Sequence, residues 1–157
     1  MSLESVRAFI AENAPDVTVI ELASSSSTMT LSAEWNIAPA QIAKTLSLRV
    51  ADRNVIVVAC GDSRLDNKKV KSVLGGQAKM LPPEEAAQLT GHPVGGMCPF
   101  ALATPMPIYF DVRLKAYDEV VPGAGATHSA IRINPLRMAE LVQAEWADLC
   151  QDPKEPA

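Results

Sequence analysis

The sequence predicts an α/β fold of the α+β type, in which peripheral helices surround a mainly antiparallel mixed sheet. One observation is a pair of neighbouring strand patterns. Residues 44–50 alternate polar and apolar side chains, and residues 55–60 are continuously apolar. The turn at 51–54 makes this pair a predicted hairpin. The other observation is that helix caps occur before and after the hairpin, and that glycine stops follow it. This mixture is typical of a sheet covered by helices.

Helix signals recur along the whole chain. Ser2 can cap a first helix, and Asp66 can cap another that stops at Gly75. Asn134 followed by Pro135 is typical of a helix start, and apolar side chains at helical spacing follow it. The expected helices are 3–14, 29–35, a single turn at 39–43, 67–74, 83–90 and 135–150.

Short apolar or β-branched runs predict the remaining strands. The run 17–22 is β-branched, and Pro105 and Pro107 interrupt the apolar stretch that follows residue 100. Besides the hairpin, the expected strands are 17–22, 78–81, 101–106, 108–114, 119–121 and 130–133.

Length and composition predict one domain over residues 1–150, followed by a polar tail at 151–157 that is expected to be disordered. Hydrophobic residues make up 48% of the chain and charged residues 20%, which is ordinary for a globular protein. No apolar run approaches the roughly 18 residues of a membrane span, and the N-terminus lacks the basic start of a secretory signal. A membrane partner is therefore not expected.

The three cysteines, Cys60, Cys98 and Cys150, are far apart in the sequence and form no C-x-x-C pair. This spacing argues against a disulfide framework and against a zinc site. We therefore expect a reducing, cytoplasmic location, with no metal and no other cofactor.

The formal net charge of −4 argues against broad, non-specific binding of nucleic acid, but it allows one local basic face. Such a region begins at Arg64 and continues through Lys68, Lys69, Lys71 and Lys79. A solvated helix surface and a phosphate-contacting surface are equally compatible with it.

A glycine–proline loop at 91–100, with the sequence GHPVGGMCPF, is the main candidate for a binding site. Glycine lets the backbone approach a ligand closely, and proline restricts the conformation of the loop. Composition alone equally allows a plain connection between strands. Lys44, at the start of a predicted strand, and a second glycine cluster at 123–128 favour the binding site, although a lysine at a strand end is usually a solvated charge.

Four segments, in this order, resemble the motifs of the YbaK-type aminoacyl-tRNA editing family, which includes free-standing deacylases and the editing domain inserted in bacterial prolyl-tRNA synthetases. The segments are 41–46 (QIAKTL), 61–66 (GDSRLD), the glycine-x-x-x-proline loop at 95–99 and 123–128 (GAGATH). The resemblance covers about 28–141 and implies the fold of that editing domain. It also implies hydrolysis of the ester between a wrongly attached amino acid and the 3′ end of tRNA.

The resemblance implies a set of catalytic residues. Lys44 matches the signature lysine of the family, and His128 falls near a histidine that some members use. In this reading, backbone amides of the loop bind the ester carbonyl or the ribose, Lys44 contacts a phosphate or the oxyanion, and His128 accepts a proton or positions the ester. No covalent intermediate is implied. The backbone amides are those of Gly95, Gly96, Met97 and Cys98.

Further residues are expected to bind the substrate. The serine run 24–28 can cap the predicted helix 29–35, which is its favoured use, or it can line the amino-acid pocket. The expected substrate-binding residues are Ser27, Thr28, Thr45, Pro99, Gly125 and Thr127, and the expected tRNA contacts are Arg64, Lys68, Lys69 and Lys71.

The expected substrate is a tRNA, tRNA-Pro or a related one, that carries a small amino acid of the alanine, cysteine, serine or threonine type. An aminoacyl-tRNA synthetase is a possible partner. Subfamilies differ in the region that contains the serine run, so the sequence leaves the identity of the amino acid open. Two alternatives also remain: Cys98 as a nucleophile, and a module of the same fold that binds a tRNA end or a protein without catalysis.

Overall fold

The computed structural model describes residues 2–21, 36–93, 97–125 and 129–151. The predicted helix at 29–35, the serine run and the tail residues 152–157 lie outside the described residues. None of the described helices combines the length and the apolar character that a membrane span needs.

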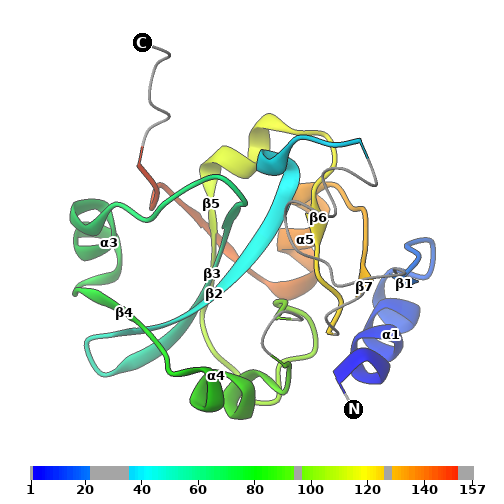
Figure 1. The fold of residues 1–157 in the computed structure, drawn as a ribbon, viewed down its shortest axis with the longest axis horizontal. Helices are drawn as coiled ribbons and strands as arrows, with labels where there is room; N and C mark the ends of the chain where they lie inside the picture. Colours follow the sequence, from blue (N-terminus) through cyan, green and yellow to red (C-terminus); the bar gives the residue numbers. More distant parts are fainter. Residues whose placement is uncertain (1, 22–35, 94–96, 126–128, 152–157) are drawn as a thin grey trace.

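The centre of the fold is a six-stranded mixed sheet with the strand order β4-β2-β3-β5-β8, in which β6 pairs with β2 (Figure 1). A separate two-stranded sheet joins β1 to β7 in antiparallel orientation. The strands are β1 (Ile20–Glu21), β2 (Ile42–Val50), β3 (Arg53–Cys60), β4 (Ala78–Met80), β5 (Ile108–Asp111), β6 (Val121–Pro122), β7 (Ser129–Ala130) and β8 (Glu145–Ala147).

The predicted hairpin is confirmed as the pair β2–β3. The two strands are antiparallel, and their register runs from Ala43 opposite Cys60 to Val50 opposite Arg53. β4 also pairs with β2 in antiparallel orientation, whereas β5, β6 and β8 pair with their neighbours in parallel. The predicted α/β class is therefore confirmed, with a mixed sheet built around one long antiparallel hairpin.

Helices cover the periphery of the sheet, as the sequence predicts. The N-cap Asp66 accepts hydrogen bonds from the backbone amides of Lys68 and Lys69, and Gly75 ends the same helix at φ 85°. Figure 1 shows α1 and α3 on opposite sides of the β2–β3 hairpin. The helices are α1 (Ser2–Asn13), α3 (Asn67–Leu74), α4 (Pro83–Thr90) and α5 (Pro135–Val142), and the 3-10 segments are η1 (Pro39–Gln41) and η2 (Val112–Ala116).

The two faces of the β2–β3 hairpin contribute to different parts of the core. Ile56 and Val58 belong to the first core cluster, which also contains buried residues of α1, of α5 and of the end of the glycine–proline loop. Val55 and Val57 belong to the second core cluster, which contains buried residues of α3. On β2, Ala43 belongs to the first cluster, whereas Leu48 and Val50 belong to the second, as the alternation of side chains along a strand requires.

The predicted helix at 135–150 is too long. The helix α5 ends at Val142, where Gln143 adopts φ 56° and its backbone N–H closes the last turn. Residues Glu145–Ala147 form β8 instead, parallel to β5, and the Trp146 ring packs edge-on against Phe110 with 5.4 Å between ring centroids. The apolar spacing fits a helix, but pairing with a distant strand decides the structure.

The predicted strand at 101–106 is wrong. Ala103 and Thr104 donate backbone hydrogen bonds to the carbonyl groups of Thr90 and Leu89 at the end of α4, so this segment packs on a helix end rather than in a sheet. The other predicted strands overlap with β1, β4, β5, β6 and β7, with shortened or shifted bounds. In particular, β5 stops at Asp111, whose carboxylate accepts a hydrogen bond from the Arg113 amide and starts η2.

Candidate active site at the open edge of strand β2

No described strand pairs with the outer edge of β2 over residues 44–47, and this stretch is called the open edge of β2. On this side of β2, β6 pairs with residues 42–43 and β4 pairs with residues 48–50. Within the described part of the chain, no strand fills the space between them. Where β4 has ended, the Leu81 amide still donates to the Ser47 carbonyl at 3.0 Å. The backbone of Thr45 points the same way as that of Ser47, because alternate residues of a strand face the same edge.

Lys44 lies at one end of this opening, and its ammonium group is held by the chain itself. Its Nζ donates to the carbonyl oxygen of Gly61 at 3.5 Å and also to that of Ser63. Gly61 is needed here, because a Cβ atom would lie only 2.5 Å from the Pro39 carbonyl oxygen. The segment after β3 therefore fixes the position of the Lys44 charge. The sequence analysis missed this function of Gly61 and Ser63.

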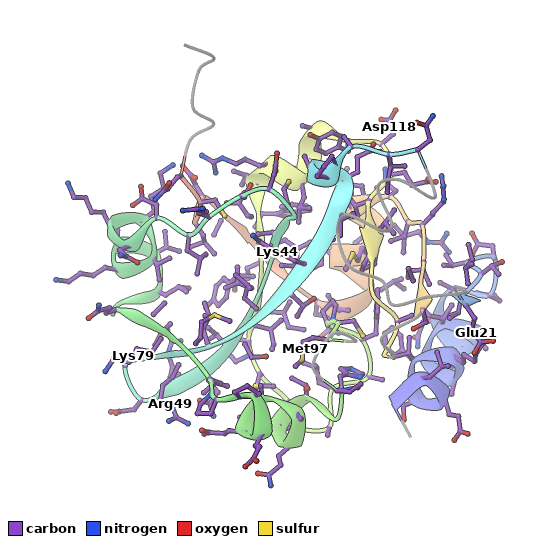
Figure 2. The ribbon with its side chains drawn as sticks, viewed as in Figure 1. Glu21, Lys44, Arg49, Lys79, Met97 and Asp118 are labelled. Atoms are coloured by element: carbon purple, nitrogen blue, oxygen red, sulfur yellow. The ribbon has the colours of Figure 1, made fainter. Side chains whose placement is uncertain are left out.

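Thr45 and Ser47 face the other side of β2, where they line a cavity of about 200 Å³. The Ser47 hydroxyl donates to the sulfur of Met97 at 3.7 Å. The Thr45 Oγ1 atom is buried and has no hydrogen-bond partner among the described residues. Figure 2 shows Lys44 on β2 and Met97 on the neighbouring loop, on the α4 side. The cavity is lined by Thr45, Ser47, Met80, Leu81, Pro83, Ala86 and Met97.

The glycine–proline loop is anchored by a buried histidine that the sequence analysis did not single out. His92 is 1% exposed, and its Nε2 lies 2.7 Å from the Phe100 carbonyl oxygen and 3.5 Å from the Cys98 sulfur. Its backbone N–H donates to Thr90 Oγ1, whose hydroxyl donates to the Ala86 carbonyl. Burial lowers the pKa of His92, so the neutral ring donates through Nε2 to Phe100. The described end of the loop is thereby tied to α4.

The thiol of Cys98 is unsuited to act as a nucleophile. It is fully buried, and burial raises its pKa to about 12. A thiol attacks through its thiolate form, which this environment disfavours. Pro99 is buried beside it. The geometry therefore counts against the alternative of a Cys98 nucleophile and leaves open the predicted role of its backbone amide.

The four predicted tRNA-contact residues differ in how accessible their charged groups are. Lys69 is half-buried, and its ammonium donates to Asp148 at 3.1 Å and to the Cys150 carbonyl at 2.9 Å. Lys68 and Lys71 are exposed and line a shallow cavity of about 230 Å³, together with Asn67 and Gln77. Arg64 is exposed at the start of this region. Lys68, Lys71 and Arg64 remain accessible to a polyanion, whereas Lys69 stabilises the fold.

Gly125 follows β6 at φ 93°, a backbone conformation that favours glycine. The remaining predicted site residues lie outside the described residues, so the structure says nothing of their positions. They are Ser27, Thr28, Gly95, Gly96, Thr127 and His128. In the described part of the chain, no three His, Cys, Asp or Glu side chains gather as metal ligands.

The arrangement can hold a ligand with two different ends. A fixed cation lies on one face of β2, and a neutral cavity with two hydroxyl groups lies on the other. The anchored loop adjoins the cavity through Met97. A ligand that carries both an anionic group and an uncharged ring or chain would match these features.

Comparison with known proteins is consistent with this geometry. Residues 23–141 match the model of the family described as the aminoacyl-tRNA editing domain. The chain is 39% identical over 155 residues to YwhH of Bacillus subtilis (strain 168), which is described as uncharacterized; the match covers 97% of this chain and 99% of that protein.

Synthetases are also similar to the chain. It is 32% identical over 120 residues to a proline–tRNA ligase of Desulfovibrio desulfuricans (strain ATCC 27774 / DSM 6949 / MB), a match that covers 76% of this chain and 20% of the ligase. A solved structure is described as that of a candidate trans-editing enzyme for prolyl tRNA synthetase. It superposes on this chain with a TM-score of 0.89 at 29% sequence identity, and the match covers 96% of this chain and 98% of the other chain. The chain thus corresponds to about a fifth of the ligase and to nearly the whole of the free-standing relatives.

Proposed function

The chain belongs to the aminoacyl-tRNA editing domain family, and from this premise we propose that it hydrolyses the ester of a wrongly attached amino acid on tRNA. The proposed substrate carries a small amino acid, of the alanine, cysteine, serine or threonine type, on tRNA-Pro or a related tRNA. The observation that supports this best is the open edge of β2, where Lys44 is held in place at one end and Ser47 contacts Met97 of the loop on the opposite face.

Lys44 supplies the positive charge of the proposed site. An ammonium group has three donors, and two of those of Lys44 are used by the carbonyl groups of Gly61 and Ser63. The third donor is then left for the terminal phosphate of the tRNA or for the oxyanion that forms during hydrolysis. A charge that is already held in place needs little reorganisation in the transition state.

The loop supplies backbone donors to the ester. In the proposed mechanism, amides of residues 95–98 bind the carbonyl oxygen as water attacks and the tetrahedral oxyanion forms. Loss of one such donor typically costs about 3 kcal/mol of transition-state stabilisation. His92 keeps the described end of the loop on α4, and this limits its movement. His128 is proposed to accept the proton of the water or to position the ester.

The mechanism needs no acyl-enzyme. The Cys98 thiol has a raised pKa, and a ribose hydroxyl of the substrate can assist the attacking water. The exposed Lys68, Lys71 and Arg64 are proposed to contact phosphates of the tRNA. We place this activity in the cytoplasm, where aminoacyl-tRNAs are used, and an aminoacyl-tRNA synthetase is a proposed partner.

A panel of mischarged tRNAs tests the proposal. Alanyl-, cysteinyl-, seryl- and threonyl-tRNA, each on more than one tRNA species, would be incubated with the protein in the presence of EDTA. We expect turnover of one or two amino acids. If no tRNA of the panel is hydrolysed but tRNA still binds, the protein is the non-catalytic binding module. If no tRNA is hydrolysed and none binds, the proposed function is overturned altogether.

A further inference from the structure

The cavity on the Thr45 face of β2 has features that the proposed mechanism does not use. It lies between the exit of β4, the first turns of α4 and the loop at Met97, and none of the described residues that line it is charged. Its walls are made of apolar groups, among them the thioethers of Met80 and Met97. Two hydroxyl groups, from Thr45 and Ser47, project from its β2 side.

The Thr45 hydroxyl is the most informative of these groups. Its Oγ1 atom is buried without a hydrogen-bond partner among the described residues. Buried polar atoms in folded proteins are nearly always satisfied, so an exception needs an explanation. A ligand that supplies the missing partner is such an explanation. Because a hydroxyl both donates and accepts, it suits a ring that presents either kind of atom.

The size of the cavity favours an aromatic ring over a small side chain. An engineered apolar cavity of about 150 Å³ binds benzene, and this cavity holds about 200 Å³. The methyl group of alanine or the hydroxymethyl group of serine would leave most of it empty. Thioether sulfur atoms also make favourable contacts with aromatic rings. A neutral, flat heterocycle of one or two rings is therefore the best match.

We propose that this cavity binds the terminal adenine base of the aminoacyl-tRNA. The inference rests on the proposed function, because the 3′ end of tRNA is an adenosine whose ribose carries the ester. The loop amides would bind the ester carbonyl, and Met97 belongs both to those amides and to the cavity wall. The terminal ribose would then connect the loop amides, which bind the ester, to the cavity, which binds the base. Thr45 and Ser47 bind the edge of the base, while Met80, Met97 and Pro83 contact its faces.

The test compares two esters of one amino acid, the best substrate of the panel. One ester is on adenosine, and the other is on 1,4-anhydroribitol, which keeps the ribose hydroxyls but lacks the base. We expect the wild type to prefer the adenosine ester about tenfold or more in kcat/KM, because burying the faces of a base against apolar groups contributes an effect of this order. Ala86→Leu, which fills the cavity, is expected to reduce this preference to near unity. Thr45→Val is expected to reduce it severalfold.

Leu136→Ala is the matched control. Leu136 is 53% exposed on α5 and does not line the cavity, so its removal is expected to leave the preference unchanged. An unchanged preference in both Ala86→Leu and Thr45→Val would overturn the adenine site. A preference that is unchanged while the ranking of amino acids shifts would also overturn it, and would assign the cavity to the amino-acid side chain. Thr45→Val keeps the test valid if Ala86→Leu does not fold.

A binding experiment separates this inference from the proposed function. If the mischarged-tRNA panel shows no turnover, the proposed function fails, and adenosine itself is titrated against the wild type and Ala86→Leu by NMR. Binding of adenosine, but not of cytidine, that Ala86→Leu abolishes would support the cavity as an adenine site in a non-catalytic module. Absence of adenosine binding to the wild type would overturn it.

Discussion

The two faces of β2 at its open edge differ in how fully their polar groups are satisfied. On one face, Lys44 is held by two backbone carbonyl groups of the segment after β3. On the other face, one residue along the strand, the Thr45 hydroxyl is buried without a partner among the described residues. We infer that the Lys44 face already holds its charged group in place for a ligand. The hydroxyl of the Thr45 face gains a hydrogen-bond partner only when a ligand binds.

The largest expected effect comes from removing the Lys44 ammonium group, which the chain itself holds in place. Lys44→Ala is expected to lower kcat/KM for deacylation by about 100-fold or more, which is typical of losing a group that stabilises an oxyanion. Lys44→Arg is not expected to restore activity, because a planar guanidinium does not replace a compact ammonium group. Circular dichroism and thermal melting would check that both variants fold. Full activity in folded Lys44→Ala would remove Lys44 from the mechanism.

The next effect tests whether the carbonyl groups position Lys44. In Gly61→Ala, the new methyl group would lie 2.5 Å from the Pro39 carbonyl oxygen. We expect the free energy of unfolding to fall by about 1–3 kcal/mol, together with a loss of deacylation. In Gly75→Ala the new methyl meets nothing within 4 Å, and φ 85° alone costs about 1 kcal/mol.

Urea unfolding and deacylation would be measured on both glycine variants. Gly75→Ala serves as the control, because it strains a helix end that does not touch Lys44. Equal activity of the two variants at temperatures where both are folded would show that the carbonyl groups of Gly61 and Ser63 do not position Lys44.

On the opposite face of β2, a substitution is expected to raise the free energy of unfolding rather than lower it. Thr45→Val keeps the shape of the side chain and removes an unsatisfied hydroxyl, so the free energy of unfolding is expected to rise by about 1 kcal/mol. Ser47→Ala is the control, because the Ser47 hydroxyl has Met97 as its partner and its removal should bring no such gain. Thermal melting without ligand measures both. A Thr45→Val variant that is less stable than the wild type would show that the hydroxyl is satisfied.

Because His92 anchors the glycine–proline loop as a neutral ring, we expect the stability of the fold to depend on pH. Burial lowers the pKa of His92 in the folded protein, whereas the unfolded chain takes up the proton near pH 6.5. Stability contributed by the neutral ring is therefore present above pH 6.5 and is lost as the pH falls, with a slope of up to about 1.4 kcal/mol per pH unit. Urea unfolding between pH 7 and 5 would measure it. The carboxyl groups of Asp16 and Asp148, whose pKa values are lowered by hydrogen bonds to Arg137 and Arg113, titrate at lower pH.

His92→Gln is expected to lack this slope. If the variant retains the slope of the wild type, another group is responsible and His92 is not the neutral anchor of the loop.

The smallest effect is expected outside the site. Lys68→Ala and Lys71→Ala are each expected to weaken tRNA binding severalfold and to reduce the slope of log affinity against log salt by about 1. Lys69→Ala is the matched control on the same helix, because its ammonium already pairs with Asp148. Binding measured at several salt concentrations would distinguish them, and equal slopes for the three variants would argue against this surface.

Much of the fold could be predicted because its signals are local. The alternation in 44–50 and the apolar run in 55–60 specify the hairpin, and Asp66 with Gly75 specifies the bounds of α3. The apolar positions around Trp146 misled the prediction, because their spacing fits a helix and a partly buried edge strand equally well. Of the candidate site, Lys44, Thr45 and Met97 were named from the sequence, whereas Gly61, Ser63 and His92 were not.

The sequence by itself determined the α/β class, the hairpin and the helix caps, because capping, turns and periodicity act within a few residues along the chain. It also indicated the family, through the resemblance of four motifs in a fixed order. Only the tertiary structure decided that β4 and β6 reach opposite ends of the same edge of β2 and leave residues 44–47 open between them. It also decided which backbone carbonyl groups hold Lys44 and that Thr45 Oγ1 has no partner among the described residues. These features depend on contacts between segments far apart in the sequence, and no local pattern specifies such contacts.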